Sequence, residues 1–298
     1  MYHGQIRIRL KSFPVFLVML KVGLDIGTGF VKCVSDHGSI RFPSVYVKRI
    51  HGHWTEKSTE AVGDRAKSML STTGAMTINP ICRGRPDPRY QKQAELLLKE
   101  SMEQIYKLAK TPAKPDEKIR IVVGLPYHAF GYRDSMTRLV RKTPNVDRCT
   151  VVSQASGTLV DLGQKSAITV SIGQGTTEIV VIDDLEVIDG ESSRWASDFV
   201  TKKIDKFAHL DMEMLNQNRD VCKKYSKVMA ENLTREICDM SENYGNQYPI
   251  VVSGGGLLLP GMHGELIPRL EKFKIFMPDD PVMSNARGLY KLAGYAEC

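Results

Sequence analysis

The residues that most clearly indicate a binding site in this sequence lie in glycine-containing turns. The first, Leu24–Lys32, reads LDIGTGFVK, an apolar run, a turn with Gly27 and Gly29, and a second run. Because glycine adopts positive φ and has no Cβ, such a turn can present consecutive backbone N–H groups to one anion. Asp25 can order water around Mg²⁺, and Lys32 can neutralise phosphate charge. The pattern predicts a phosphate-binding turn, although an ordinary glycine-rich hairpin could have the same sequence.

Two further turns extend this pattern. Val170–Glu178 contains SIGQG where the first turn has DIGTG, so the two turns suggest two homologous domains that face each other. Ile250–Gly261 reads as an apolar strand, three consecutive glycines and the start of a helix. Such glycines let a flat ring approach the backbone, and a helix N-terminus favours phosphate oxygens. Each turn alone is a weak signal, but the three together predict a nucleotide site in a shared cleft.

The elements that must position these turns alternate between strands and helices, which favours an α/β fold. Short β-branched runs bounded by glycine are typical of strands buried on both faces. The predicted strands are Lys21–Ile26, Ile119–Gly124, Cys149–Ser153, Ile168–Ile172, Glu178–Ile182 and Pro249–Ser253. Apolar residues at helical spacing predict helices over Gln91–Lys110, Asp220–Met240, Gly261–Phe273 and Ser284–Ala296.

Composition excludes several classes of protein. With 298 residues, 42% hydrophobic and 25% charged, the chain is long enough for about two domains and is neither disordered, collagen-like nor a polytopic membrane protein. The net charge of +7 is not concentrated in a long basic run, so we predict no direct contact with nucleic acid. Six scattered cysteines without a zinc spacing suggest a reducing, cytoplasmic location and no structural metal.

The first 20 residues have a pattern of charge and hydropathy that differs from the rest of the chain. A basic start and an apolar run over residues 13–20 imitate a signal peptide, but the run is shorter than the roughly 20 residues of a membrane span. We therefore expect no integral membrane segment. Residues 1–20 are predicted to be an extension, with Met19 as a plausible start, and a membrane-tethering role for it is the alternative.

The motifs resemble those of the actin-like ATPase superfamily, which also holds Hsp70 chaperones and sugar kinases. Asp25–Lys32 is similar to its first phosphate motif and Gly173–Thr177 to its second. The adenosine motif is matched by Ser253–Gly256, and the two connecting segments by Val152–Gly157 and Asn285–Leu289. Within the superfamily, Phe42-Pro43-Ser44 and the Asn-Ala-Arg-Gly run look similar to the ParM-like plasmid-segregation actins and to short archaeal actin-like proteins.

The resemblance implies a two-domain, ribonuclease H-like α/β fold with a nucleotide cleft between the domains. Domain I would span residues 21–162 with an insertion, IB, at about 45–115. Domain II would span residues 163–298 with a small insertion, IIB, at about 190–248, and the C-terminal helix could return to domain I. The protein would be an ATPase that polymerises into cytoskeletal or DNA-segregating filaments, with a DNA-bound adaptor as a further possible partner.

The resemblance also assigns roles to residues. ATP or ADP would be held with Mg²⁺, the metal being bound by Asp25 through water. Gln154 would orient the attacking water, and Asp25 and Glu178 would assist catalysis. The nucleotide would contact Gly27, Thr28, Gly29, Lys32, Gly173, Gln174, Gly175, Thr176, Gly254, Gly255, Gly256 and Leu257. Gln154 could instead be structural near the hinge, Glu178 an exposed strand acid, and Arg287 and Gly288 parts of a helix cap.

One departure from the superfamily pattern concerns Ser171, which stands where many members have an acid. Serine adds no charge, so either Asp25 and Glu178 suffice for hydrolysis or hydrolysis is slow. This leaves two alternatives to a polymerising ATPase. One is a non-hydrolysing, nucleotide-gated scaffold or adaptor. The other is a small-molecule kinase, for which Asp161 and Asp198 would be available as bases although neither stands in a recognisable motif.

Overall fold

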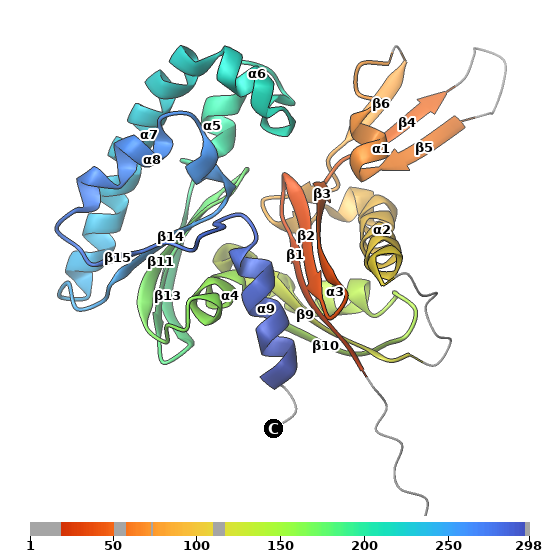
Figure 1. The fold of residues 1–298 in the computed structure, drawn as a ribbon, viewed down its shortest axis with the longest axis horizontal. Helices are drawn as coiled ribbons and strands as arrows, with labels where there is room; N and C mark the ends of the chain where they lie inside the picture. Colours follow the sequence, from red (N-terminus) through yellow and green to blue (C-terminus); the bar gives the residue numbers. More distant parts are fainter. Residues whose placement is uncertain (1–18, 51–57, 73, 110–116, 296–298) are drawn as a thin grey trace, which may run out of the picture.

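In a computed structural model, two five-stranded sheets stand side by side with helices between and around them (Figure 1). The structure describes residues 19–50, 58–72, 74–109 and 117–295. The predicted extension falls almost entirely outside these residues. None of the described helices is long and apolar enough to span a bilayer.

The first sheet has the order β10-β9-β1-β2-β3 and is parallel at one side and antiparallel at the other. Its strands are β1 (Leu20–Ile26), β2 (Phe30–Ser35), β3 (Gly38–Pro43), β9 (Ile119–Leu125) and β10 (Val146–Ser153). One face packs on α2 (Gln91–Leu108) and α3 (Arg133–Val140). Val122 on the other face packs on Leu289 and Ala293 of α9 (Ser284–Tyr295). Helices on both faces explain why β9 is buried along its whole length.

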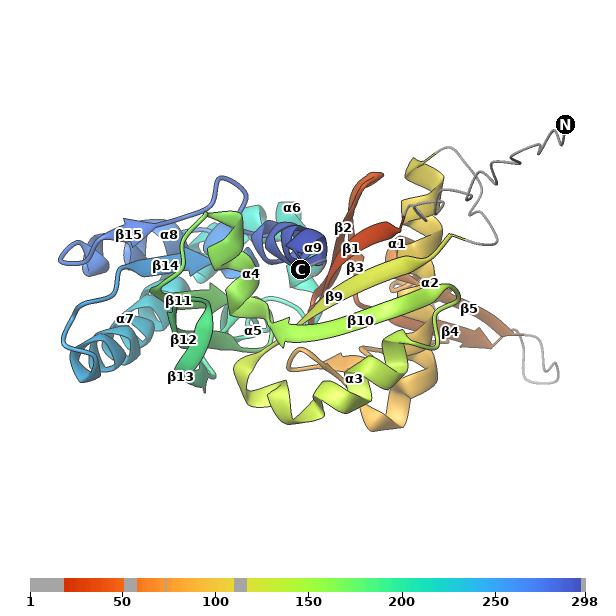
Figure 2. The same ribbon diagram turned by 90° about the horizontal axis from the view of Figure 1, so that it is seen from below.

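The second sheet has the order β13-β12-β11-β14-β15. Its strands are β11 (Ala167–Ile172), β12 (Thr177–Asp183), β13 (Glu186–Ser193), β14 (Ile250–Ser253) and β15 (Ile275–Phe276). One face packs on α7 (Arg219–Asn243) and α8 (Met262–Leu266), and the other on α4 (Gln154–Asp161). Figure 2 shows α4 and α9 in contact between the two sheets.

The two sheets repeat one topology. β11 pairs antiparallel with β12 and parallel with β14, as β1 does with β2 and β9. In this correspondence the register pair Ser171–Glu178 takes the place of Asp25–Lys32. The likeness of the two turns in sequence therefore has a counterpart in strand order and register.

Smaller elements are added to each half. A three-stranded sheet with its own apolar cluster contains β4 (Tyr46–Ile50), β5 (Ser58–Val62) and β6 (Ala75–Ile78), beside α1 (Gly63–Lys67). It stands on the same side of the molecule as α5 (Ser197–Thr201) and α6 (Met212–Gln217) (Figure 1). The remaining elements are β7 (Ile81–Cys82), β8 (Arg85–Pro86) and the 3₁₀ turns η1 (Pro88–Tyr90), η2 (Tyr127–Tyr132), η3 (Ala208–Leu210), η4 (Gly255–Leu258) and η5 (Pro268–Leu270). The predicted boundaries of the domains and of IB and IIB stay predictions.

All six predicted strands are confirmed, although β10 begins earlier than predicted, at Val146. Three of the four predicted helices are confirmed as well. The prediction of one helix over Gly261–Phe273 is wrong, because α8 ends at Leu266 and Pro268 begins a separate 3₁₀ turn. Proline has no N–H to donate and its ring clashes with the preceding turn, so a regular helix cannot continue through it.

Candidate functional site

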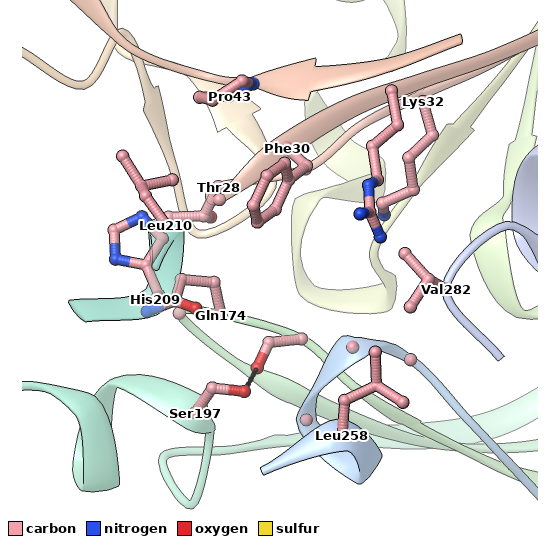
Figure 3. A pocket seen from close by; sticks show the side chains of 18 of the residues that line it. Thr28, Phe30, Lys32, Pro43, Gln174, Ser197, His209, Leu210, Leu258 and Val282 are labelled. Atoms are coloured by element: carbon pink, nitrogen blue, oxygen red, sulfur yellow. Dashed lines mark hydrogen bonds between the residues drawn. The ribbon is translucent and has the colours of Figure 1, made fainter. Parts of the chain in front are cut away.

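A cavity of about 450 Å³ lies between the two sheets, and all three glycine-containing turns line it. Figure 3 shows Phe30 and Lys32 on one side of this cavity and Ser197 and Leu258 on the opposite side. The predicted site residues that line it are Asp25, Gly27, Thr28, Gly29, Lys32, Gln154, Gly173, Gln174, Gly175, Thr176, Gly254, Gly255 and Gly256. Residues more than 200 positions apart in the sequence are thus brought together.

The first turn joins β1 to β2 and is held from behind. The Ser44 hydroxyl donates to the Gly27 carbonyl at 2.7 Å, and the Ser44 N–H donates to the Gly29 carbonyl at 3.0 Å. Asp25 and Lys32 are direct neighbours across the two strands, and Lys32 Nζ lies 2.7 Å from Asp25 Oδ2. The Asp25 side chain is only 3% exposed, and the Lys32 ammonium balances its charge before any ligand binds.

Thr28 at the tip of this turn is hydrogen-bonded to residues 79–84, a segment that the sequence did not indicate as part of the site. Its hydroxyl accepts from the Gly84 N–H at 2.9 Å, and its carbonyl accepts from Asn79 Nδ2 at 2.7 Å. Gly84 also lines the cavity. The Gly-Arg-Pro run that marks the β7–β8 hairpin was a signal for a loop, but nothing local indicated where that loop would pack.

The second turn is fixed by contacts to α5 and lies against the first. The Ser197 N–H donates to the Gly173 carbonyl, and Gln174 Nε2 donates to Asp198 Oδ1. A Cβ built on Gly29 would lie 3.1 Å from Gln174 Cβ, and one built on Gly175 would lie 3.3 Å from Thr28. The absence of side chains at these glycines lets the two turns approach each other.

The third turn is glycine-rich for two different reasons. A Cβ on Gly254, which has φ of 96°, would lie 2.4 Å from the Ile172 carbonyl oxygen, and a Cβ on Gly256 would lie 2.1 Å from the Ile172 side chain. These two glycines allow η4 to pack on β11. A Cβ on Gly255, by contrast, would meet nothing within 4 Å. Leu257 does not line the cavity but is buried in the core of the second half.

Several apolar side chains line the cavity. Met212 and Leu258 come from different elements and both line it, yet they are 48% and 47% exposed. His209 and Leu210 line the cavity as well, and the His209 ring meets Phe30 edge-on at 6.4 Å between centroids. Burial lowers the pKa of His209, so its imidazole is neutral at pH 7. A flat apolar group would cover exposed side chains here.

Of the three predicted catalytic residues, the structure brings two to the cavity. Asp25 and Gln154 line it, as does Ser171. Glu178 lies outside the described lining and is 1% exposed. Its carboxylate accepts from the Tyr127 N–H and the Ser192 hydroxyl. It is therefore neither at the cavity surface nor an exposed strand acid.

The helices α4 and α9 join the two halves through close backbone contact. A Cβ on Gly288 would lie 1.7 Å from the Gly157 carbonyl oxygen. Beside this crossing, Asp161 accepts from Ser284, Arg287 and Lys291 of α9. Burial raises the pKa of Asp161, but these hydrogen bonds outweigh it and hold the pKa below its ordinary value. Arg287 and Gly288 are thus parts of a helix–helix contact.

The residues of the cavity fit a hydrated metal ion rather than a dedicated cage. Among the described residues, no three His, Cys, Asp or Glu side chains gather as a metal site. Asp25 is already paired with Lys32, and Ser171 opposite it carries no charge. An Mg²⁺ ion keeps several waters and is commonly bound through one carboxylate plus phosphate oxygens, which matches this donor set.

Comparison with known proteins identifies the fold of this chain. Residues 23–160 match the family described as the N-terminal domain of actin-like proteins. MamK in its double helical filament has a TM-score of 0.71 and 20% identity, over 93% of this chain and 99% of MamK. The chain has an actin-like fold. No curated protein matches it in sequence.

Three further solved structures share the actin-like fold over nearly their whole length. The archaeal actin homologue Ta0583 has a TM-score of 0.69 and 17% identity, over 93% of this chain and 100% of Ta0583. The apo pSK41 ParM protein has a TM-score of 0.66 and 18% identity, over 94% and 98%. A non-polymerising MamK mutant bound to AMPPNP has a TM-score of 0.65 and 19% identity, over 93% and 99%.

Proposed function

We propose that this actin-like protein binds ATP with Mg²⁺ in the cavity, polymerises in that state and hydrolyses ATP slowly after assembly. The observation that carries the proposal is the enclosure of one cavity by three glycine turns from both halves. Solved MamK structures include a filament and an AMPPNP complex. Both support the proposal for a chain of the same fold.

In this proposal the first turn and Lys32 bind phosphate from one side, and Gly173, Gly175 and Thr176 bind it from the other. Adenosine lies along Gly254–Gly256, with its base between Met212 and Leu258. Mg²⁺, when bound, neutralises phosphate charge and is held by Asp25 through water. Gln154 orients the attacking water, since phosphoryl transfer depends mainly on positioning and charge stabilisation. Glu178 is given no part in this chemistry, because its side chain is not among those that line the cavity.

A nucleotide-gated scaffold or adaptor is the second candidate, and a specific observation favours it. Ser171 lines the cavity opposite Asp25 and brings no charge, and the charge of Asp25 is already balanced by Lys32. The small-molecule kinase has less support. Asp161 is bonded to α9 and Asp198 to Gln174 and Lys202, and neither lines the cavity.

A steric block at the adenosine end tests the proposal. Gly255→Leu should fill the cavity without a backbone clash, because a Cβ there points into open space. Gly264→Leu is the matched control, since it is also exposed and unobstructed but lies on α8 outside the cavity. We expect Gly255→Leu to weaken Mg–ATP binding at least about 10-fold, about 1.4 kcal/mol, and the control to bind normally.

Fluorescent ATP titration and phosphate release, measured on all three proteins, give the result. No Mg–ATP binding by folded wild type, or equal binding by Gly255→Leu, would overturn the nucleotide site. Binding without phosphate release would favour the scaffold candidate.

A further inference from the structure

A contact between the halves lies apart from the α4–α9 crossing. The 3₁₀ turn η2 follows β9 of the first sheet and rests on β12 and β13 of the second. At its centre is the Glu178 carboxylate, 1% exposed, which accepts from the Tyr127 N–H at 2.5 Å. His128 Nδ1 lies 3.1 Å from the same carboxylate and 2.8 Å from Ser192 Oγ. Donors from both halves thus satisfy one buried acid.

The packing around this acid is equally specific. A Cβ on Gly190 of β13 would lie 3.0 Å from Tyr127 Cγ, so the tyrosine ring lies directly over the strand. His128 and Ser192 are partly exposed and cover Glu178 from solvent. Both contact the carboxylate, His128 through Nδ1 and Ser192 through Oγ. The cluster is therefore a structural contact that joins the two halves.

The position of the cluster connects it to the cavity. Pro126, the residue before Tyr127, lines the cavity, and so does Ser171, the register partner of Glu178. The chain itself passes between the halves at α4 and returns before α9. A rotation of the halves about that crossing would pull η2 off β13 and break the contacts that Tyr127 and His128 make with the Glu178 carboxylate, while Ser192 stays on the same half as the acid. Such a rotation is therefore opposed by the loss of hydrogen bonds to a charged group.

We propose that Glu178, His128 and Ser192 form a buckle that holds the two halves in the closed arrangement. Glu178 is in this view a positioning residue, which fixes Pro126 against the cavity by holding the Tyr127 backbone. Opening of the cleft requires the buckle to release. The buckle thereby sets how long a bound nucleotide stays, and this last consequence rests on the proposed function.

Hydrogen exchange of the full chain without nucleotide tests the buckle directly. Glu178→Gln keeps the shape of the side chain but loses the charge that attracts three donors. Exchange in residues 127–132 should become at least about 10-fold faster in Glu178→Gln and several-fold faster in His128→Ala. Glu186→Gln is the matched control, because this exposed glutamate lies on the neighbouring strand β13 and should leave that exchange unchanged.

The dissociation rate of a fluorescent ATP analogue with Mg²⁺ is the second measurement, and it should rise with the exchange rate in both buckle variants. Unchanged exchange in both folded variants would overturn the buckle. Slower hydrolysis in Glu178→Gln with unchanged exchange and dissociation would overturn it too and restore a catalytic role for Glu178. Faster exchange in a protein that binds no ATP in any form would uphold the buckle and overturn the proposed function.

Discussion

Asp25 and Lys32 show how single side chains are prepared for a ligand. Their positions on adjacent strands put the carboxylate and the ammonium 2.7 Å apart, and both side chains are largely buried. A lysine held in this way loses little further freedom when a phosphate binds. The pair gives the first turn a fixed charge arrangement that the second turn lacks, because Ser171 and Glu178 take its place there.

Gln154 is a second single residue with a proposed role. Its role in orienting the attacking water can be tested separately from its contribution to the structure. Gln154→Ala keeps the Cβ that packs against Gly124 but removes the amide that would orient water. We expect Mg–ATP affinity within about two-fold of wild type and hydrolysis at least about 10-fold slower, a loss of about 1.4 kcal/mol in transition-state stabilisation. Single-turnover phosphate release beside ATP titration measures both. Hydrolysis at the wild-type rate would instead favour the structural role near the hinge.

At the scale of elements, the crossing of α4 and α9 depends on the absence of a side chain at Gly288. A Cβ there would lie 1.7 Å from the Gly157 carbonyl oxygen, and backbone atoms cannot move away as a flexible side chain can. Gly288→Ala should lower the free energy of unfolding by at least about 3 kcal/mol. Gly294→Ala on the same helix meets nothing within 4 Å and should raise it by up to about 1 kcal/mol.

Urea denaturation of wild type and the two alanine variants measures these changes. If Gly288→Ala were as stable as Gly294→Ala, the close crossing of the helices would be wrong.

The Asp161 cluster joins the same two helices by charge, and its contribution should depend on pH. Because the folded-state pKa is lowered, the stabilisation is complete above the unfolded pKa of about 4 and is lost as the pH falls through the folded pKa. Asp161→Asn should cost about 1–3 kcal/mol at pH 7 and clearly less at pH 3. Denaturation across this pH range measures the difference, with Asp134→Asn, exposed on α3, as the control. A difference that stays constant with pH would contradict the proposed charge effect.

At the scale of the whole molecule, the α4–α9 crossing joins the two halves and the cavity lies between them. A ligand that contacts the turns of both halves favours one relative angle between them, as any ligand shifts a protein toward the state it binds best. A filament requires a repeated subunit shape, so fixing this angle would promote assembly.

Polymerisation should therefore require nucleotide. We expect pelleting and light scattering to rise above a critical concentration with Mg–ATP, less with ADP, and not at all without nucleotide. Gly255→Leu should fail to pellet at the same concentrations, whereas Gly264→Leu should behave as wild type. A monomer at all micromolar concentrations and several salts, with ATP bound, would contradict assembly and support the adaptor candidate.

The sequence by itself determined the strands, the two phosphate-type turns and the glycine turn before η4. These signals are local, since β-branched runs and glycine positions depend on near neighbours in the chain. It also indicated a repeat, because the turns at Asp25 and Ser171 share a pattern that the sheets repeat in their topology. The helix ending at Leu266 was missed, although Pro268 was a visible signal for it.

Only the tertiary structure decided which residues meet. Nothing near Glu178 in the sequence shows that Tyr127 and His128 lie against it, since these contacts join residues about 50 positions apart. The same holds for Thr28 with Gly84, and for Asp161 with Arg287. Such pairs form because the sheets, built by local rules, pack through α4 and α9 in one arrangement. A glutamate read from its motif as catalytic thus proves to be buried between the halves.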